Sequence, residues 1–174
     1  LVKYGAKHVV MDTVMASTSG HHLMEPEAVE YYRRKLLPLA EIYTPNLPEA
    51  ELLLKTTIKT KEERVAAARD FALQYRGIID LKGGHDAVCA DDLFYDGKDF
   101  MWLKERHIEN SNTHGTGCTL SSGIAANLAK GYDLDTSVKR AKAYLSGALG
   151  AMLNLGSGSG PMDHGFELRG TYCQ

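Results

Sequence analysis

The stretch Asn112-Thr113-His114-Gly115-Thr116-Gly117-Cys118-Thr119-Leu120 runs from a glycine-punctuated loop into the start of an apolar helix. Gly115 and Gly117 permit backbone turns that residues with a Cβ resist. The N–H groups from Gly115 to Cys118 can then converge, and the helix expected from Cys118 adds unpaired N–H groups and the positive end of its dipole. The stretch therefore predicts an anion-binding site with a thiol at its mouth. An ordinary helix start with a buried cysteine is the alternative, since short glycine motifs also arise by chance.

Strands and helices alternate on the N-terminal side of this loop. Short apolar runs predict buried strands at residues 8–12, 42–44 and 78–81. Helices are expected from Glu25 until Pro38 stops the first one, after Asn46, and over residues 61–75 with Gly77 ending the last. This alternation predicts an α/β protein with a mostly parallel central sheet covered by helices.

The pattern changes after residue 90. Asp96-Gly97 between two apolar runs predicts a β-hairpin over residues 92–103 with a type I′ turn, and residues 106–108 suggest one more strand. Two helices are expected beyond the glycine loop, over residues 118–130 with Gly131 as C-cap and over 134–153. No internal repeat and no domain boundary is evident, so one domain is expected.

Composition narrows the class of protein. The chain has 174 residues, is 44% hydrophobic and 24% charged, and carries a net charge of −2, so it shows no electrostatic basis for binding nucleic acid or a membrane surface. Cys89, Cys118 and Cys173 lack CxxC spacing, which favours a reducing cytoplasm over a disulfide framework. No apolar run approaches the roughly 18 residues of a membrane span. The first residues read like the tail of a helix rather than a signal peptide, which predicts that the chain is part of something longer.

Several common site motifs are absent from the sequence. There is no GxxxxGK[ST] phosphate loop, no GxGxxG dinucleotide fingerprint and no GxSxG nucleophile elbow. His21-His22 lacks the i,i+4 spacing of a helical zinc site.

Four chemically useful features follow predicted strands or begin predicted helices. They are Asp12, Asn46 with Glu49, Lys82 with Gly83-Gly84, and the glycine loop. In a parallel sheet these positions converge on one edge, where ligands bind. Two carboxylates that can hold Mg²⁺, an amine for phosphate oxygens, and backbone N–H groups for developing charge are the parts that phosphoryl transfer requires.

Two of these features have alternative interpretations. Asn46 followed by Glu49 also matches a helix capping box. Cys118 is either the base that accepts the acceptor hydroxyl's proton or a nucleophile that forms a covalent intermediate, in which case His114 is the nearest candidate base in the sequence. Thiols at helix N-termini ionise more readily than free cysteine, which suits either role.

Five segments, taken together, resemble the hydroxymethylpyrimidine/phosphomethylpyrimidine kinases of thiamine biosynthesis, within the ribokinase-like superfamily. They occur in the family's order and are Val9–Met15, Thr44–Ala50, Leu81–His85, Asn112–Ser121 and Gly158–Pro161. The GTGC sequence is the most specific, because related pyridoxal and sugar kinases usually carry Asp at the position of Cys118. The resemblance implies a three-layer αβα fold in the cytoplasm, with residues 1–174 forming the C-terminal two thirds of a single kinase domain that lacks its N-terminal strands.

The resemblance also implies an activity: phosphorylation of 4-amino-5-hydroxymethyl-2-methylpyrimidine and then of its monophosphate, with ATP and Mg²⁺. The implied site residues are Cys118 as base, Gly115, Thr116 and Gly117 as anion hole, Lys82, Thr44 and Asn46 near the ATP phosphates, Asp12 and Glu49 near the metal, and the backbone of Val14 near the pyrimidine. The expected partners are these small molecules, without nucleic acid or membrane, and a homodimer is left open. A pyridoxine/pyridoxal-type kinase of the same fold and a non-catalytic ligand-binding remnant remain alternatives.

Overall fold

The computed structural model of the chain describes residues 1–15, 24–83, 91–104, 108–153, 155, 158 and 160–168. It divides into two compact units, residues 1–107 and 108–174, and each is considered by itself. Predictions that involve His21, His22, Gly84, His85, Cys89, residues 105–107, Ser159 and Cys173 lie outside the described residues.

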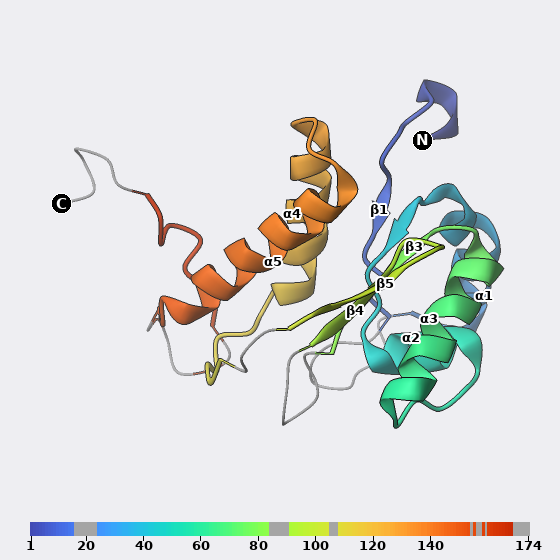
Figure 1. Cartoon of the computed structure of the whole chain (residues 1–174), viewed down its shortest axis with the longest axis horizontal. Coiled ribbons are helices and arrows are strands. Elements are labelled where there is room, and N and C mark those ends of the chain that lie inside the picture. Colours follow the sequence, from blue (N-terminus) through green and yellow to red (C-terminus); the bar gives the residue numbers. More distant parts are fainter. Residues whose placement is uncertain are drawn as a thin grey trace. The chain divides into compact units, whose positions relative to one another are not determined.

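The first unit is built on a five-stranded sheet with strand order β1-β2-β3-β4-β5 (Figure 1). The strands are β1 Val10–Met11, β2 Ile42–Tyr43, β3 Ile78–Leu81, β4 Asp92–Tyr95 and β5 Phe100–Leu103. β1, β2 and β3 run parallel, whereas β4 and β5 are antiparallel to their neighbours. The α/β class and the parallel N-terminal strands are therefore confirmed, and the sheet as a whole is mixed.

Three helical segments pack against this sheet in the first unit. They are α1 Pro26–Tyr31, which continues as η2 Tyr32–Leu36 and η3 Leu37–Leu39, then α2 Leu47–Leu54 and α3 Lys61–Tyr75. Their buried faces join the sheet in one apolar cluster that includes Leu37, Tyr43, Leu53, Phe71 and Ile79. This burial anchors the short strands, since two-residue strands have little pairing energy of their own.

Two helix ends differ from the prediction. Pro38 does not stop the first helical segment, because it occupies one of the first two positions of η3, where its missing N–H is not needed. α3 spans the predicted residues 61–75, but its C-cap is Arg76, which adopts the left-handed conformation at φ 57°, and the residue that ends it is therefore not Gly77. Gly77 is required for a different reason: a Cβ there would lie 2.4 Å from Tyr43 Cε2 and 2.9 Å from the Glu41 carbonyl oxygen.

The predicted hairpin forms, but with a different turn. Tyr95 pairs with Phe100, so four residues rather than two connect β4 and β5. The Asp96 carboxylate accepts hydrogen bonds from the backbone N–H groups of Lys98 and Asp99 at 2.8 and 2.7 Å. This side-chain cap stabilises a longer loop, in which Gly97 takes the positive φ of 97°.

The second unit contains α4 Thr116–Ala129 and α5 Leu134–Gly150, which lie side by side (Figure 1). Gly123 permits the close approach, because a Cβ there would lie 3.0 Å from the Ala141 Cβ. α4 ends at Ala129 with Lys130 as its C-cap, one residue earlier than predicted, and Gly131 follows with a positive φ of 87°. α5 is shorter than predicted, and Met152, which we expect in the buried stripe, is 50% exposed with φ 54°.

Candidate functional site

The predicted acidic and basic residues of the first unit meet where β1, β2 and β3 end. Asp12 follows β1, Thr44 follows β2 and Lys82 follows β3. The parallel register places these ends together, and two backbone hydrogen bonds continue it: Thr44 N–H donates to Met11 O at 3.1 Å and Lys82 N–H to Pro45 O at 2.8 Å. The sheet topology therefore brings three chemically distinct side chains to one edge.

Asp12 is the centre of this group. Its Oδ1 accepts hydrogen bonds from Lys82 Nζ at 3.1 Å and from Thr44 Oγ1 at 3.3 Å. The Asp12 and Lys82 side chains are only 13% and 15% exposed, so their ion pair is largely shielded from water. Asp12 Oδ2 is buried and has no hydrogen-bond partner within the described part of the chain. A buried carboxylate oxygen left unpaired is costly, which indicates a position that another donor or a cation can occupy.

Glu49 lies in the first turn of α2 and is 5% exposed. Its Oε2 accepts hydrogen bonds from Thr13 Oγ1 at 3.0 Å and from Asn46 N–H at 2.9 Å, while Asn46 Oδ1 accepts from Glu49 N–H at 2.8 Å. The predicted capping box is thus confirmed. Burial raises the pKa of the Glu49 carboxyl, and the Lys82 charge and the two hydrogen bonds only partly oppose that shift.

The structure therefore brings together five of the predicted site residues, Asp12, Thr44, Asn46, Glu49 and Lys82. Val14 follows shortly after Asp12 and is 36% exposed, between buried Thr13 and Met15. Its predicted contact with a pyrimidine stays a prediction.

Two residues of this cluster had no predicted role. Thr13 is fully buried, and its hydroxyl donates to Glu49. In the sequence, only its position directly after Asp12 could have indicated this role. Tyr32 Oη donates to Asp12 O at 3.4 Å. Burial first, and then the Asp12 and Glu49 charges, raise the pKa of Tyr32 well above its usual value. The apolar periodicity of its helix marks Tyr32 only as a core residue.

The glycine loop belongs to the second unit. Gly115 adopts φ 82° and ψ 10° and is the N-cap of α4, so the helix begins at Thr116, two residues earlier than predicted. Cys118 consequently lies at the third helical position with an exposed thiol, which excludes the buried-cysteine alternative.

Gly115 has no side chain with which to cap the helix. Among the described residues, no acceptor is found for the N–H groups of Gly117 and Cys118. Unpaired first-turn N–H groups at the positive end of a 14-residue helix form the anion-binding arrangement that the sequence predicts. Since this loop lies in a different unit from Asp12 and Lys82, its convergence with them stays a prediction.

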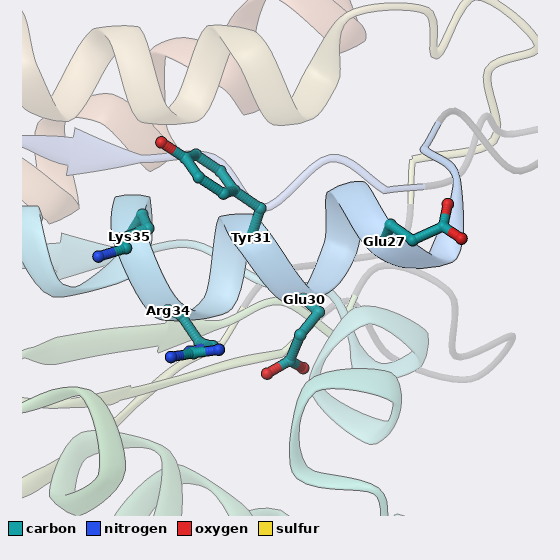
Figure 2. A pocket seen from close by; sticks show the side chains of 5 residues that line it. All are labelled: Glu27, Glu30, Tyr31, Arg34 and Lys35. Atoms are coloured by element: carbon teal, nitrogen blue, oxygen red, sulfur yellow. The ribbon is translucent and has the colours of Figure 1, made fainter.

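A surface groove lies along α1 and η2 in the described part of the first unit. It has a volume of about 250 Å³ and is lined by Glu27, Glu30, Tyr31, Arg34 and Lys35, whose side chains point away from the helix in several directions (Figure 2). None of the predicted site residues lines it. Mixed charges at helical spacing are typical of a solvated helix face, so the groove is no candidate active site.

The class of protein follows from comparison with solved structures. The chain superposes on the ADP complex of Bacillus subtilis pyridoxal kinase with a TM-score of 0.79 and 31% identity, over 94% of this chain and 61% of that one. It superposes on phosphomethylpyrimidine kinase from Clostridium difficile 630 with a TM-score of 0.72 and 35% identity, over 84% and 59%. The fold is that of the ribokinase-like kinases.

A family model described as phosphomethylpyrimidine kinase matches residues 1–163, so the chain belongs to the phosphomethylpyrimidine kinase family. It is 45% identical to the hydroxymethylpyrimidine/phosphomethylpyrimidine kinase of Rhizobium meliloti over 91% of this chain and 61% of that protein. The chain spans about 60% of the length of the curated bacterial kinases that it matches. None of the helices in the described residues combines the length and apolar character that crossing a membrane requires.

Proposed function

We propose that the protein carrying this chain phosphorylates 4-amino-5-hydroxymethyl-2-methylpyrimidine and then its monophosphate with ATP, in thiamine biosynthesis. The observation that carries the proposal is the exposed Cys118 thiol in the first turn of α4, where the Gly117 and Cys118 N–H groups have no acceptor among the described residues. Membership of the phosphomethylpyrimidine kinase family supports the same assignment.

The proposed transfer uses the glycine loop at the acceptor end. The Cys118 thiolate takes the proton of the substrate's hydroxymethyl group as that oxygen attacks the γ-phosphorus of ATP. A new P–O bond forms, the bond between the γ-phosphorus and the β,γ-bridging oxygen breaks, and ADP leaves with the electron pair. The N–H groups of Gly115, Thr116 and Gly117 would stabilise the negative charge on the transferred phosphoryl oxygens, and the Thr116 N–H would exchange its 3.4 Å bond to Thr113 O for a phosphoryl oxygen.

The first-unit cluster suits the nucleotide phosphates and a magnesium ion. Lys82, Thr44 and Asn46 are proposed to face the phosphates, and Asp12 with Glu49 to hold Mg²⁺ directly or through water. The unpaired Asp12 Oδ2 supports this fit. Mg²⁺ is commonly held by one or two carboxylates together with substrate phosphates, which the pair of carboxylates here could supply. When bound, Mg²⁺ would neutralise phosphate charge.

The domain organisation, the cellular location and the partners of the whole protein are part of the same proposal. We infer that residues 1–174 form the C-terminal two thirds of a single three-layer αβα kinase domain that works in the cytoplasm on small molecules. A homodimer is compatible with this proposal.

A pyridoxal-type kinase is the second candidate, because the similar Bacillus subtilis structure is a pyridoxal kinase. The deciding experiment measures kcat/KM of the intact protein with ATP and Mg²⁺ on hydroxymethylpyrimidine, its monophosphate and pyridoxal. We expect the pyrimidine alcohol to exceed pyridoxal by at least about tenfold, a difference of roughly 1.4 kcal/mol in transition-state binding. A preference for pyridoxal would replace the proposal with the second candidate. Ligand binding without turnover of any of the three would leave the non-catalytic alternative.

A further inference from the structure

Asn112 is a buried polar residue in the loop that leads to α4. It is 8% exposed, and its side chain bonds to two backbone groups from the segment after α5. Its Nδ2 donates to the Leu153 carbonyl oxygen, and its Oδ1 accepts from the Gly160 N–H at 2.9 Å. One amide therefore joins residues that are 41 and 48 positions apart in sequence.

The contact requires an amide side chain at position 112 and a glycine at position 160. The Leu153 carbonyl needs a donor and the Gly160 N–H needs an acceptor, so an aspartate at position 112 would satisfy only the second. A Cβ on residue 160 would lie 2.7 Å from Asn112 Oδ1 and 3.0 Å from the Leu155 carbonyl oxygen. Only a residue without a side chain fits there without displacing the segment.

Neighbouring contacts hold the same loop on both sides of Asn112. The Asn112 N–H donates to Asn110 Oδ1 at 2.8 Å, and Asn110 Nδ2 donates to the Leu149 carbonyl oxygen at 2.7 Å. His114 forms a parallel β-bridge with Pro161. The backbone is thus held up to the residue before Gly115, where the anion-binding turn begins.

We propose that Asn112 is a positioning residue for phosphoryl transfer. By tying the loop to the segment after α5, it fixes the backbone from which the unpaired N–H groups of Gly117 and Cys118 project. Donors aimed at developing charge act only when they are held in place, and a misplacement of about 1 Å can cost about a hundredfold in rate. The expected effect on kcat rests on the proposed function, whereas the expected effect on the loop rests on the contacts of Asn112 alone.

The kinetic test compares Asn112→Asp and Gly160→Ala in the intact protein. Asn112→Asp removes the donor to the Leu153 carbonyl oxygen, and Gly160→Ala crowds Asn112 Oδ1, so each variant weakens a different end of the link that the Asn112 side chain makes. Neither variant changes a residue between Gly115 and Cys118. We expect kcat to fall roughly ten- to a hundredfold in both, with KM for ATP within about threefold of the unmodified protein. The double variant should lose less than the product of the two single effects, because both changes weaken the link that one side chain makes. Unchanged kcat in both variants, or a loss confined to KM for ATP, would overturn the proposal.

Asn127→Asp is the matched control. Asn127 Nδ2 donates to the Gly123 carbonyl oxygen at 2.8 Å and its Oδ1 accepts from Arg140 Nε at 2.8 Å, near the far end of α4. The same amide-to-acid change there should leave kcat within about twofold. An equal loss of kcat in the control would show that the loss is a general effect of destabilising this unit, and would also overturn the proposal.

Hydrogen exchange separates this inference from the proposed function. If the unmodified protein phosphorylates no alcohol tested, the proposed function fails, but the amide exchange of Thr116 and Thr119 still reports on the loop. Their N–H groups bond to Thr113 O at 3.4 Å and Gly115 O at 2.9 Å. We expect faster exchange at both in Asn112→Asp and Gly160→Ala but not in Asn127→Asp. Equal exchange in all three would contradict the role of Asn112.

Discussion

At the scale of single residues, Glu49 illustrates how one side chain serves both structure and chemistry. Its carboxylate closes the capping box of α2 and lies close enough to Asp12 that the two negative charges oppose each other. Burial is the largest influence on its pKa, which is raised above the usual value of 4.5. Retaining a charge there costs stability, and such costs are common at functional sites.

Glu49→Gln is expected to stabilise the protein at neutral pH. Because the folded-state pKa of Glu49 is raised, its carboxyl contributes most to folding stability below pH 4.5, and that contribution is lost as pH rises through the folded-state pKa. Glutamine keeps the acceptor of the capping box without the charge. The variant should therefore gain up to about 1 kcal/mol at pH 7 and show no gain at pH 4.

Urea unfolding at both pH values measures this difference. Asp135→Asn is a matched control, since Asp135 is an exposed acid that pairs with Lys139 at 2.7 Å on the surface of α5. It should give no stabilisation at pH 7. A lower stability of Glu49→Gln at pH 7 would contradict the raised pKa.

Two experiments on Cys118 distinguish its two candidate roles, general base and nucleophile. We expect Cys118→Ala in the intact protein to lower kcat by about two orders of magnitude or more while ATP affinity persists, because the thiol acts on the acceptor hydroxyl. Rapid-quench kinetics and titration calorimetry measure the two quantities. Near-normal kcat would remove the base assignment, and a phosphorylated cysteine in the unmodified protein would replace it with the covalent alternative.

At the scale of elements, the connection from α3 to β3 depends on a close approach. Gly77 faces the ring of Tyr43, whose hydroxyl is itself within 3.1 Å of the carbonyl oxygens of Leu37, Ala40 and Tyr75. The ring cannot move away easily, since Phe71 and Tyr75 pack against it with centroids at 5.4 and 6.0 Å. β3, and with it Lys82, is positioned by this packing.

Gly77→Ala is expected to destabilise the protein by about 1–3 kcal/mol, because the new methyl group would overlap Tyr43 and the Glu41 carbonyl. Gly150→Ala, at the end of α5, is the control: a Cβ there meets nothing within 4 Å, and the change should be neutral or slightly stabilising. Thermal denaturation of both variants makes the comparison. A Gly77→Ala variant as stable as the unmodified protein would show that Tyr43 can relax.

At the scale of the whole molecule, the proposed reaction needs the phosphate end and the acceptor end together. The two lie in separate compact units of the chain, residues 1–107 and 108–174. A ligand that contacts groups from both units stabilises the folded protein by mass action.

We therefore expect a non-hydrolysable ATP analogue with Mg²⁺ to raise the melting temperature of the intact protein. At one hundred times its dissociation constant the ligand would contribute about 2.7 kcal/mol. Removing Mg²⁺ with a chelator, or replacing Lys82 with Met, should reduce the shift, because the phosphate charge then lacks its partners. Differential scanning calorimetry with and without the metal tests this, and an equal shift without Mg²⁺ and in Lys82→Met would contradict the proposed phosphate site.

Much of the local structure was predictable because it depends on neighbouring residues. The bounds of α3 and β3 and the capping box at Asn46 follow from periodicity and from hydrogen bonds three residues apart. The start of α4 was placed two residues too late, because the left-handed Gly115 takes the N-cap position and lets Thr116 and Gly117 join the helix. The four-residue hairpin loop was missed, because the Asp96 side chain caps it in competition with a type I′ turn.

The sequence by itself determined the α/β class, the family and the candidate residues, because these depend on periodicity and on the order of short motifs along the chain. Only the tertiary structure showed that Asp12 pairs with Lys82, that Thr13 hydrogen-bonds Glu49, and that Asn112 joins the loop before α4 to Leu153 and Gly160. The physical reason is that these contacts link residues tens of positions apart. Their distances are set by strand register and helix packing, which no local pattern encodes.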